Sequence, residues 1–201
     1  MKETEKAYLA GLLDGEGSIC IVSYTPKETG RPRVIPSVKI GMHSKAAVEF
    51  FAKATGKNMT HSKGSRGGWS CSLNYKDASD FLEEVLPYLL TKRPQALFFL
   101  FYYSITFNAS YRGGGNRVPD EMVELRTTGA NVLRMLNKFD DATFSGKADE
   151  FNERLSLEMS KFQDMITLSQ ASLGENFEEG ATTREVSPNN NLPHERPPLI
   201  H

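Results

Sequence analysis

The sequence predicts an α+β fold in which helices cover one face of an antiparallel sheet. Three observations support it. A stretch with helical periodicity runs directly into a β-branched segment, two pairs of alternating segments are each joined by a glycine-containing turn, and apolar helical patterns follow both pairs. The expected order is helix, two strands, helix, two strands, helix, with further helices behind. The 39% of hydrophobic residues suffices for a sizeable core.

The first helix is expected to start at Thr4, a suitable N-cap, and to stop at Gly17. Leu9, Leu12 and Leu13 form an apolar stripe that faces a core. Another face has small residues, which let two backbones approach closely; they are Ala7, Ala10, Gly11 and Gly15. Glycine within a helix costs about 1 kcal/mol relative to alanine, so this pattern indicates a function.

The strand segments alternate between a core face and a polar face. The first runs from Ser18 to about Lys27, the second from Arg33 to His43, and residues 58–75 hold a weaker pair. The residues expected on the core face of the second and fourth strands are Val34, Pro36, Val38, Ile40, Met42, Trp69, Cys71 and Leu73. The polar face of the same strands carries Arg33, Ser37, Lys39, Gly41, Ser70, Ser72 and Asn74.

Helical patterns account for most of the remaining chain. One is expected from Ser44 to Gly56, and Asp77 opens a second. The others are a helix with Pro94 in its first turn, one from Pro119 to about Lys138, and an amphipathic helix around 151–166. Gly113-Gly114-Gly115 lacks the pattern of a phosphate-binding loop and is interpreted as a connection between helices.

The formal net charge of −1 conceals an uneven distribution. From Gly17 to Gly68 nine lysines and arginines stand against two glutamates, a net charge of +7. From Asp140 to the C-terminus twelve acidic residues stand against five basic ones, a net charge of −7. A basic segment built of strands is typical of a surface that contacts phosphates, although a solvated basic face is the simpler alternative.

The two cysteines, Cys20 and Cys71, lie in strand segments without the spacing of a zinc site. We expect both to be reduced, in an intracellular protein of the cytoplasm or an organelle, because no signal peptide is recognisable. The most apolar run, Ala96 to Phe107, is too short to span a bilayer, so no membrane contact is expected.

One stretch resembles the signature of the LAGLIDADG homing endonucleases, with conservative changes only: Leu9-Ala10-Gly11-Leu12-Leu13-Asp14-Gly15-Glu16-Gly17. The resemblance extends as a pattern over residues 5–140. It implies a saddle-shaped sheet whose concave face lies on double-stranded DNA. It also implies a site-specific, intron-encoded endonuclease that hydrolyses phosphodiester bonds in both strands of a long, near-palindromic target.

The resemblance further implies a divalent metal, Mg²⁺ or Mn²⁺, held by hard oxygen ligands. The last acidic residue of the motif binds it in the family, which is Glu16 here, and the backbone carbonyl of Gly15 contributes. Because the chain has one motif, the second carboxylate must come from another copy, so a homodimer is implied. The interface residues are then Ala7, Ala10, Gly11, Asp14 and Gly15, with Asp14 as a helix-end or interface residue rather than a ligand.

In related single-motif enzymes, a lysine early in the fourth helix and a polar residue ending the second strand arrange the attacking water. Lys92 matches the lysine, with Arg93 as the competing choice. His43 stands at the polar position, where glutamine is familiar. The catalytic candidates are therefore Glu16, Lys92 and His43.

DNA contacts are expected from the polar strand face and from the turns. The candidates for base recognition are Arg33, Ser37, Lys39, Ser70, Ser72 and Asn74. The candidates for phosphate contacts are Lys27, Arg31, Lys63 and Arg66. Parity turns a rather apolar set of the first strand toward DNA, namely Ser18, Cys20, Val22 and Tyr24.

Three regions are expected: an endonuclease domain over 1–140, an additional helix over 141–173, and a disordered acidic and proline-rich tail over 174–201. Two other functions occur on the same fold. An intron-splicing maturase would bind RNA, and a non-cleaving regulator would bind DNA, usually with an added helix-turn-helix and without the motif acid. Residues 118–173 show no clear helix-turn-helix, and Glu16 is retained.

Overall fold

The computed structural model describes residues 1–63, 67–107, 118–138 and 148–179. The first half runs α1 (Glu3–Glu16), β1 (Gly17–Tyr24), β2 (Arg33–Met42), α2 (Lys45–Thr55), β3 (Thr60–His61) and β4 (Trp69–Asn74). The second half runs α3 (Lys76–Val85), a short 3₁₀ helix (Leu86–Tyr88), α4 (Arg93–Phe107), α5 (Asp120–Leu136) and α7 (Ala148–Glu179). This order confirms the predicted α+β arrangement.

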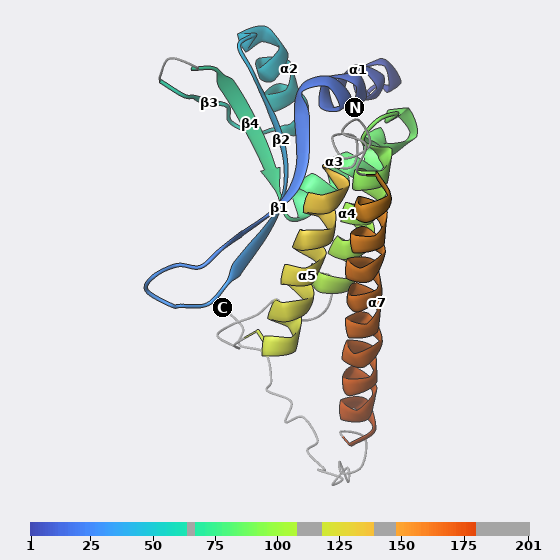
Figure 1. Cartoon of the computed structure of the whole chain (residues 1–201). Helices are drawn as coiled ribbons and strands as arrows, with labels where there is room; N and C mark the ends of the chain where they lie inside the picture. The colour runs from blue at the N-terminus through green and yellow to red at the C-terminus, as the bar shows by residue number, and fades with distance from the viewer. Residues whose placement is uncertain (64–66, 108–117, 139–147, 180–201) are drawn as a thin grey trace, which may run out of the picture.

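The four strands form one antiparallel sheet in the order β1-β2-β4-β3 (Figure 1). Alternation assigned its faces correctly: Val34, Val38 and Ile40 are buried on one side of β2, and Arg33 and Lys39 are exposed on the other. The weaker strand pair is shorter than predicted, because β3 has only two residues. The outer face of the sheet therefore carries the predicted polar residues of β2 and β4.

Helix α1 passes into β1 without a loop, and Gly17 makes this transition feasible. A Cβ at Gly17 would lie 2.9 Å from the carbonyl oxygen of Leu13, closer than carbon and oxygen can approach. The predicted start at Thr4 is wrong: the N-cap is Lys2, whose backbone N–H donates to the Glu5 carboxylate at 2.8 Å. Leu9 and Leu13 are fully buried, which fixes the orientation of α1.

Behind the sheet, α4, α5 and α7 lie side by side (Figure 1). The ring of Phe162 on α7 packs against those of Phe98, Phe101 and Tyr102 on α4. The Tyr102 hydroxyl donates to the Arg126 carbonyl of α5 at 3.2 Å. Helix α7 is therefore part of the main core rather than an appendage.

The C-terminal boundaries differ from those expected. Helix α7 spans Ala148–Glu179 and so extends past the expected boundary at Gly174. Residues 180–201 and the Gly113–Gly115 segment lie outside the described ranges. Within those ranges, no helix combines the length and the apolar character needed to cross a membrane.

Candidate nucleic-acid interface

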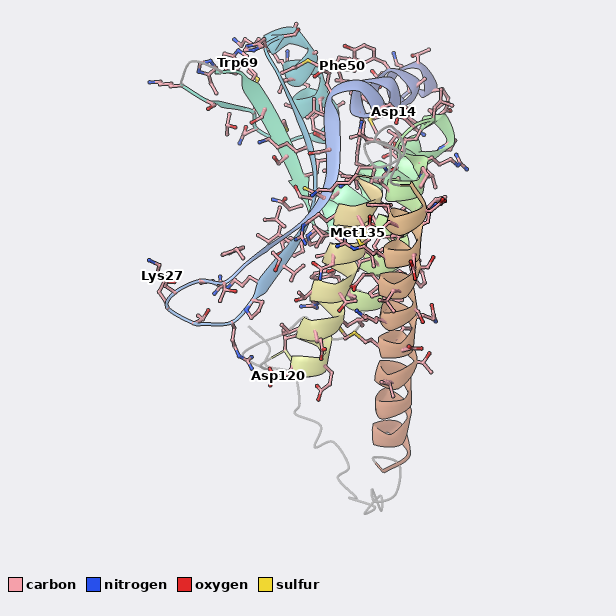
Figure 2. All side chains as sticks on the ribbon, in the orientation of Figure 1. Asp14, Lys27, Phe50, Trp69, Asp120 and Met135 are labelled. Carbon is pink, nitrogen blue, oxygen red and sulfur yellow. The ribbon has the colours of Figure 1, made fainter. Side chains whose placement is uncertain are left out.

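The end of α1 and the start of α4 are joined through Asp14. Its carboxylate accepts hydrogen bonds from the backbone N–H groups of Leu90 and Lys92, each at 2.8 Å. These amides lie where α4 begins and have no partner within that helix, so Asp14 caps α4 from outside. Figure 2 shows Asp14 at the contact between the two helices.

Lys92 completes this contact by donating from Nζ to the backbone carbonyl of Asp14. Carbonyl groups at a helix C-terminus carry partial negative charge, which a lysine stabilises. The competing residue, Arg93, instead donates from Nη1 to the Leu86 carbonyl at 2.8 Å. Of the two candidates, Lys92 is therefore the cation that contacts the motif.

The Asp14 carboxyl is held in its charged form. Its partial burial opposes ionisation, but hydrogen bonds from the backbone of Leu90 and Lys92 favour the anion, and the pKa of Asp14 is lowered overall. Asp14 is thus committed within the chain, as a helix-end residue.

Gly15 and Glu16 are exposed at the last turn of α1, one and two residues beyond Asp14. Among the described residues, Glu16 has no ion-pair partner. Its carboxylate and the Gly15 carbonyl are hard oxygen donors of the type that Mg²⁺ prefers. Across the described ranges, no three acidic, histidine or cysteine side chains gather as a metal site.

The small residues of α1 divide into an open face and a buried position. Ala7, Gly11 and Gly15 are exposed, and a Cβ added at either glycine would meet no atom within 4 Å. Ala10 is 0% exposed and packs into the chain's own core. Of the predicted interface residues, Ala7, Gly11 and Gly15 are thus open to a partner, Ala10 has no exposed surface, and Asp14 is half-buried at the end of the helix.

His43 directly follows β2, at the same end of the sheet as the α1–β1 junction. Ile40 pairs with Gly17, so the last residues of β2 pass beyond the start of β1. The His43 side chain is exposed. No contact links His43 to Glu16 or Lys92 among the described residues.

The outer face of the sheet places several predicted base-contact residues in rows. Ser18, Lys39 and Ser72 form one row across β1, β2 and β4, and all three are exposed. Cys20, Ser37 and Asn74 form the next. Ser37, predicted to contact bases, is only 7% exposed.

The Cys20 thiol lies beside Ser37 in this second row. Burial raises its pKa, and the opposing effect of Lys39 does not offset this, so the thiol stays protonated at neutral pH. The row is therefore close-packed at its centre and carries no thiolate. Its most accessible polar side chain is that of Asn74.

The predicted phosphate-contact residues have different environments. Lys27, in the β1–β2 loop, and Lys63, after β3, are exposed (Figure 2 labels Lys27). Arg31 in the same loop pairs with Asp120 at the start of α5, with 2.6 Å between Nη2 and Oδ1, so this guanidinium is engaged within the chain. Arg66 lies outside the described residues.

The sequence did not predict that the Asp14 side chain caps the start of α4. The available signal was an acidic residue in the last turn of a helix, where anions are disfavoured. Such a residue needs compensating donors, but nothing in the local pattern shows that they come from residues 90–92. The structure also has a cavity of about 500 Å³ between the β1–β2 hairpin and the helices α4 and α5.

The cavity has cationic and aromatic walls, and three of its four lining cations have partners within the chain, the fourth being Arg33. Lys76 pairs with Asp80, Arg31 with Asp120, and Arg126 donates to the Thr106 carbonyl. We therefore assign it no ligand.

The architecture is similar to that of solved homing endonucleases. One is I-CvuI in complex with the I-CreI target in the presence of 2 mM Mg, with the DNA not cleaved: it is 20% identical, at a TM-score of 0.55 over 77% of this chain and 96% of that chain. Another is I-CvuI in complex with its own target in the presence of 2 mM Ca, 21% identical at a TM-score of 0.54 over 66% of this chain and 82% of that chain. The sequence matches no protein-family model and no curated protein.

This chain thus has the fold of the LAGLIDADG homing endonucleases. The fold expected from the nonapeptide is confirmed.

Proposed function

We propose that this protein is a site-specific, divalent-metal-dependent DNA endonuclease that cuts both strands of a long, near-palindromic target as a homodimer. The observation that carries the proposal is the α1–α4 junction. An exposed carboxylate, Glu16, follows a helix end to which Lys92 is bound through Asp14. This arrangement brings an acidic ligand and a cation to one edge of a basic sheet.

The DNA would lie on the outer face of the sheet, which carries Lys39, Ser72 and Asn74. A two-stranded ribbon fits the major groove, where such side chains can donate to and accept from base edges. Lys27 and Lys63 would contact phosphates, which positions the protein without selecting a sequence. The two solved I-CvuI structures are likewise complexes, one with the I-CreI target, whose DNA is not cleaved, and one with the enzyme's own target.

The homodimer is supported by the open face of α1. Gly11 and Gly15 have empty space beside them, although glycine is unfavourable within a helix. Packing this face against the same face of a second copy would bring two Glu16 residues together, one for each strand. The two-fold symmetry of such a dimer would be mirrored by the near-palindromic target.

The Glu16 carboxylate and the Gly15 carbonyl fit Mg²⁺ or Mn²⁺, because both donors are oxygens and both residues are exposed. Glu16 and the Gly15 carbonyl would hold the ion. When bound, the metal would neutralise charge on the scissile phosphate and activate the attacking water. Lys92 would add positive charge at the same end of α1, and His43 would orient water from the end of β2.

The test is cleavage of total host DNA and of a randomised duplex library with Mg²⁺, followed by sequencing of the cut ends. Discrete double-strand breaks at one family of sites are expected. Glu16→Gln should bind the same sites as the wild type without cutting them, because a neutral amide is a poor Mg²⁺ ligand.

Three outcomes would contradict the proposal or part of it. Cutting by Glu16→Gln at the wild-type rate would refute the metal assignment. Wild-type binding without cutting would favour a regulator, and RNA-dependent splicing without DNA cleavage would favour a maturase.

A further inference from the structure

The outer face of the sheet changes character along the β1–β2 hairpin. Near α1 its rows are polar, with Ser18 opposite Lys39. Farther out, Val22 pairs with Ile35, and Tyr24 pairs with Arg33. Val22 is 46% exposed and Tyr24 is 43% exposed, so apolar surface lies open on a face that otherwise presents polar and cationic groups.

This apolar surface is not a part of the core that happens to be exposed. The core face of the same strands is formed by Ile19, Ile21 and Val34, which are all buried. Val22 and Ile35 have the opposite parity, and Ile35 lies between the exposed Arg33 and the row of Ser37. We call the pair Val22 and Ile35 the apolar step.

The surroundings indicate what covers the apolar step. Arg33 is in the next row outward, Lys27 lies in the loop beyond it, and Lys39 lies two rows inward on the same face. An apolar partner protein would have to bury these charges, whereas DNA supplies phosphates for them. In the major groove, the apolar group that a base edge offers is the 5-methyl of thymine, or of 5-methylcytosine.

We propose that Val22 and Ile35 read pyrimidine 5-methyl groups, so that the outer part of each half-site requires thymine. The inference rests on the proposed DNA-binding function and adds a substrate feature to it. A strand rises about 3.3 Å per residue, close to the 3.4 Å spacing of base pairs. Val22 is four residues beyond Ser18, so the thymine should lie about four base pairs outward from the base pair under Ser18 and Lys39.

The test changes the DNA rather than the protein, which avoids any effect on folding. Selection from a randomised duplex library defines the bound half-site, and thymine is then replaced by deoxyuridine one position at a time. Deoxyuridine keeps the pairing and loses only the methyl group. Burial of one such group contributes about 0.8 kcal/mol, so we expect about fourfold weaker binding at the outer position.

Two variants connect this effect to the apolar step. Val22→Thr replaces a methyl group with a hydroxyl, and Ile35→Thr replaces an ethyl group with a hydroxyl. The double variant should therefore show a clearly smaller difference between thymine and deoxyuridine targets. Leu157→Thr, at an exposed apolar position of α7 away from the sheet, is the matched control and should retain the fourfold difference.

Three results of the binding experiments would overturn the inference. They are no thymine selected at the outer positions, equal wild-type affinity for the thymine and deoxyuridine targets, or an unchanged difference between these targets in the double variant. Each leaves sequence-specific binding, and hence the proposed function, intact. Failure to select any duplex would reject both together. If another copy of the chain covered the apolar step, the protein without DNA would have a mass above that of the dimer, and the double variant would lose this excess. That result would also overturn the inference.

Discussion

Helices α1 and α5 both contain glycine, yet the space beside the two sets of glycines is opposite. A Cβ at Gly129 of α5 would lie 2.5 Å from Cε2 of Tyr102 and 3.0 Å from Cε2 of Phe162. A Cβ at Gly11 or Gly15 of α1 would meet nothing within 4 Å. In α5 the chain itself fills the space that glycine leaves, whereas in α1 the space is open.

This difference separates a glycine that the fold itself explains from two glycines that it does not. Gly129 is explained by α4 and α7, which approach α5 too closely for a side chain. Gly11 and Gly15 carry the helical cost of glycine with no such compensation within the chain. The open space beside Gly11 and Gly15 is therefore the surface to which the proposed homodimer assigns a second copy of the chain.

Replacing glycine by alanine in each helix tests this difference most directly. Gly129→Ala should lower the free energy of unfolding by about 1–3 kcal/mol, because the core must shift to admit a methyl group. Gly11→Ala, measured at a dilution where the chain is monomeric, should raise it by up to about 1 kcal/mol. Urea denaturation measures both, and a loss of stability in Gly11→Ala equal to that in Gly129→Ala would end the contrast.

Another face of α1 is tied within the chain, and Asp14→Ala tests it. Loss of this cap should cost about 0.5–2 kcal/mol of stability and loosen the backbone that positions Lys92, because the Lys92 N–H loses its carboxylate acceptor. Cleavage should fall in kcat while the Kd for DNA stays near wild type, and Asp14→Asn should restore part of both properties. A rise in the Kd for DNA with no fall in kcat would contradict the positioning of Lys92 by Asp14.

The same residue predicts a pH dependence of stability. The folded-state pKa of Asp14 is below its usual value of 3.8, so its contribution is complete above that pH. It should be lost as the pH falls from about 4 through the lowered pKa. Wild type and Asp14→Ala should therefore converge in melting temperature under acidic conditions, and a constant difference from pH 7 to pH 2 would contradict this.

Gly11→Leu should change the stability of the monomer little but remove the close approach of two α1 helices. We expect a monomer by light scattering and no double-strand breaks. Leu97→Ala, on an exposed position of α4, is a control that should leave the mass unchanged. An unchanged dimer in Gly11→Leu would refute the open face as the interface.

Substitutions on the outer face of the sheet should change DNA binding and leave the stability of the fold nearly unchanged. Lys39→Ala should relax base preference at one position of each half-site, at a cost of about 1–3 kcal/mol there. Lys63→Ala should weaken binding to all sequences alike and reduce the salt slope by about one unit. Equal losses for both variants across single-base variants of the target would mean that the strand faces are misassigned.

The sequence alone determined the elements and their faces, because both depend on local periodicity. The leucine spacing predicted α1, alternation predicted which side of β2 is buried, and proline and glycine predicted where α2 and α4 end or begin. The nonapeptide predicted the fold. All of these signals act within about two helical turns or one strand, where neighbouring residues set the backbone geometry.

Tertiary structure decided which residues meet. Asp14 accepts hydrogen bonds from amides 76 and 78 residues later in the chain, and Arg31 pairs with Asp120, 89 residues away. Phe162 enters the core only because Gly129 leaves room for Tyr102. Such contacts depend on how elements pack after distant segments come together, and the pattern within any one segment carries no information about the partner it will find.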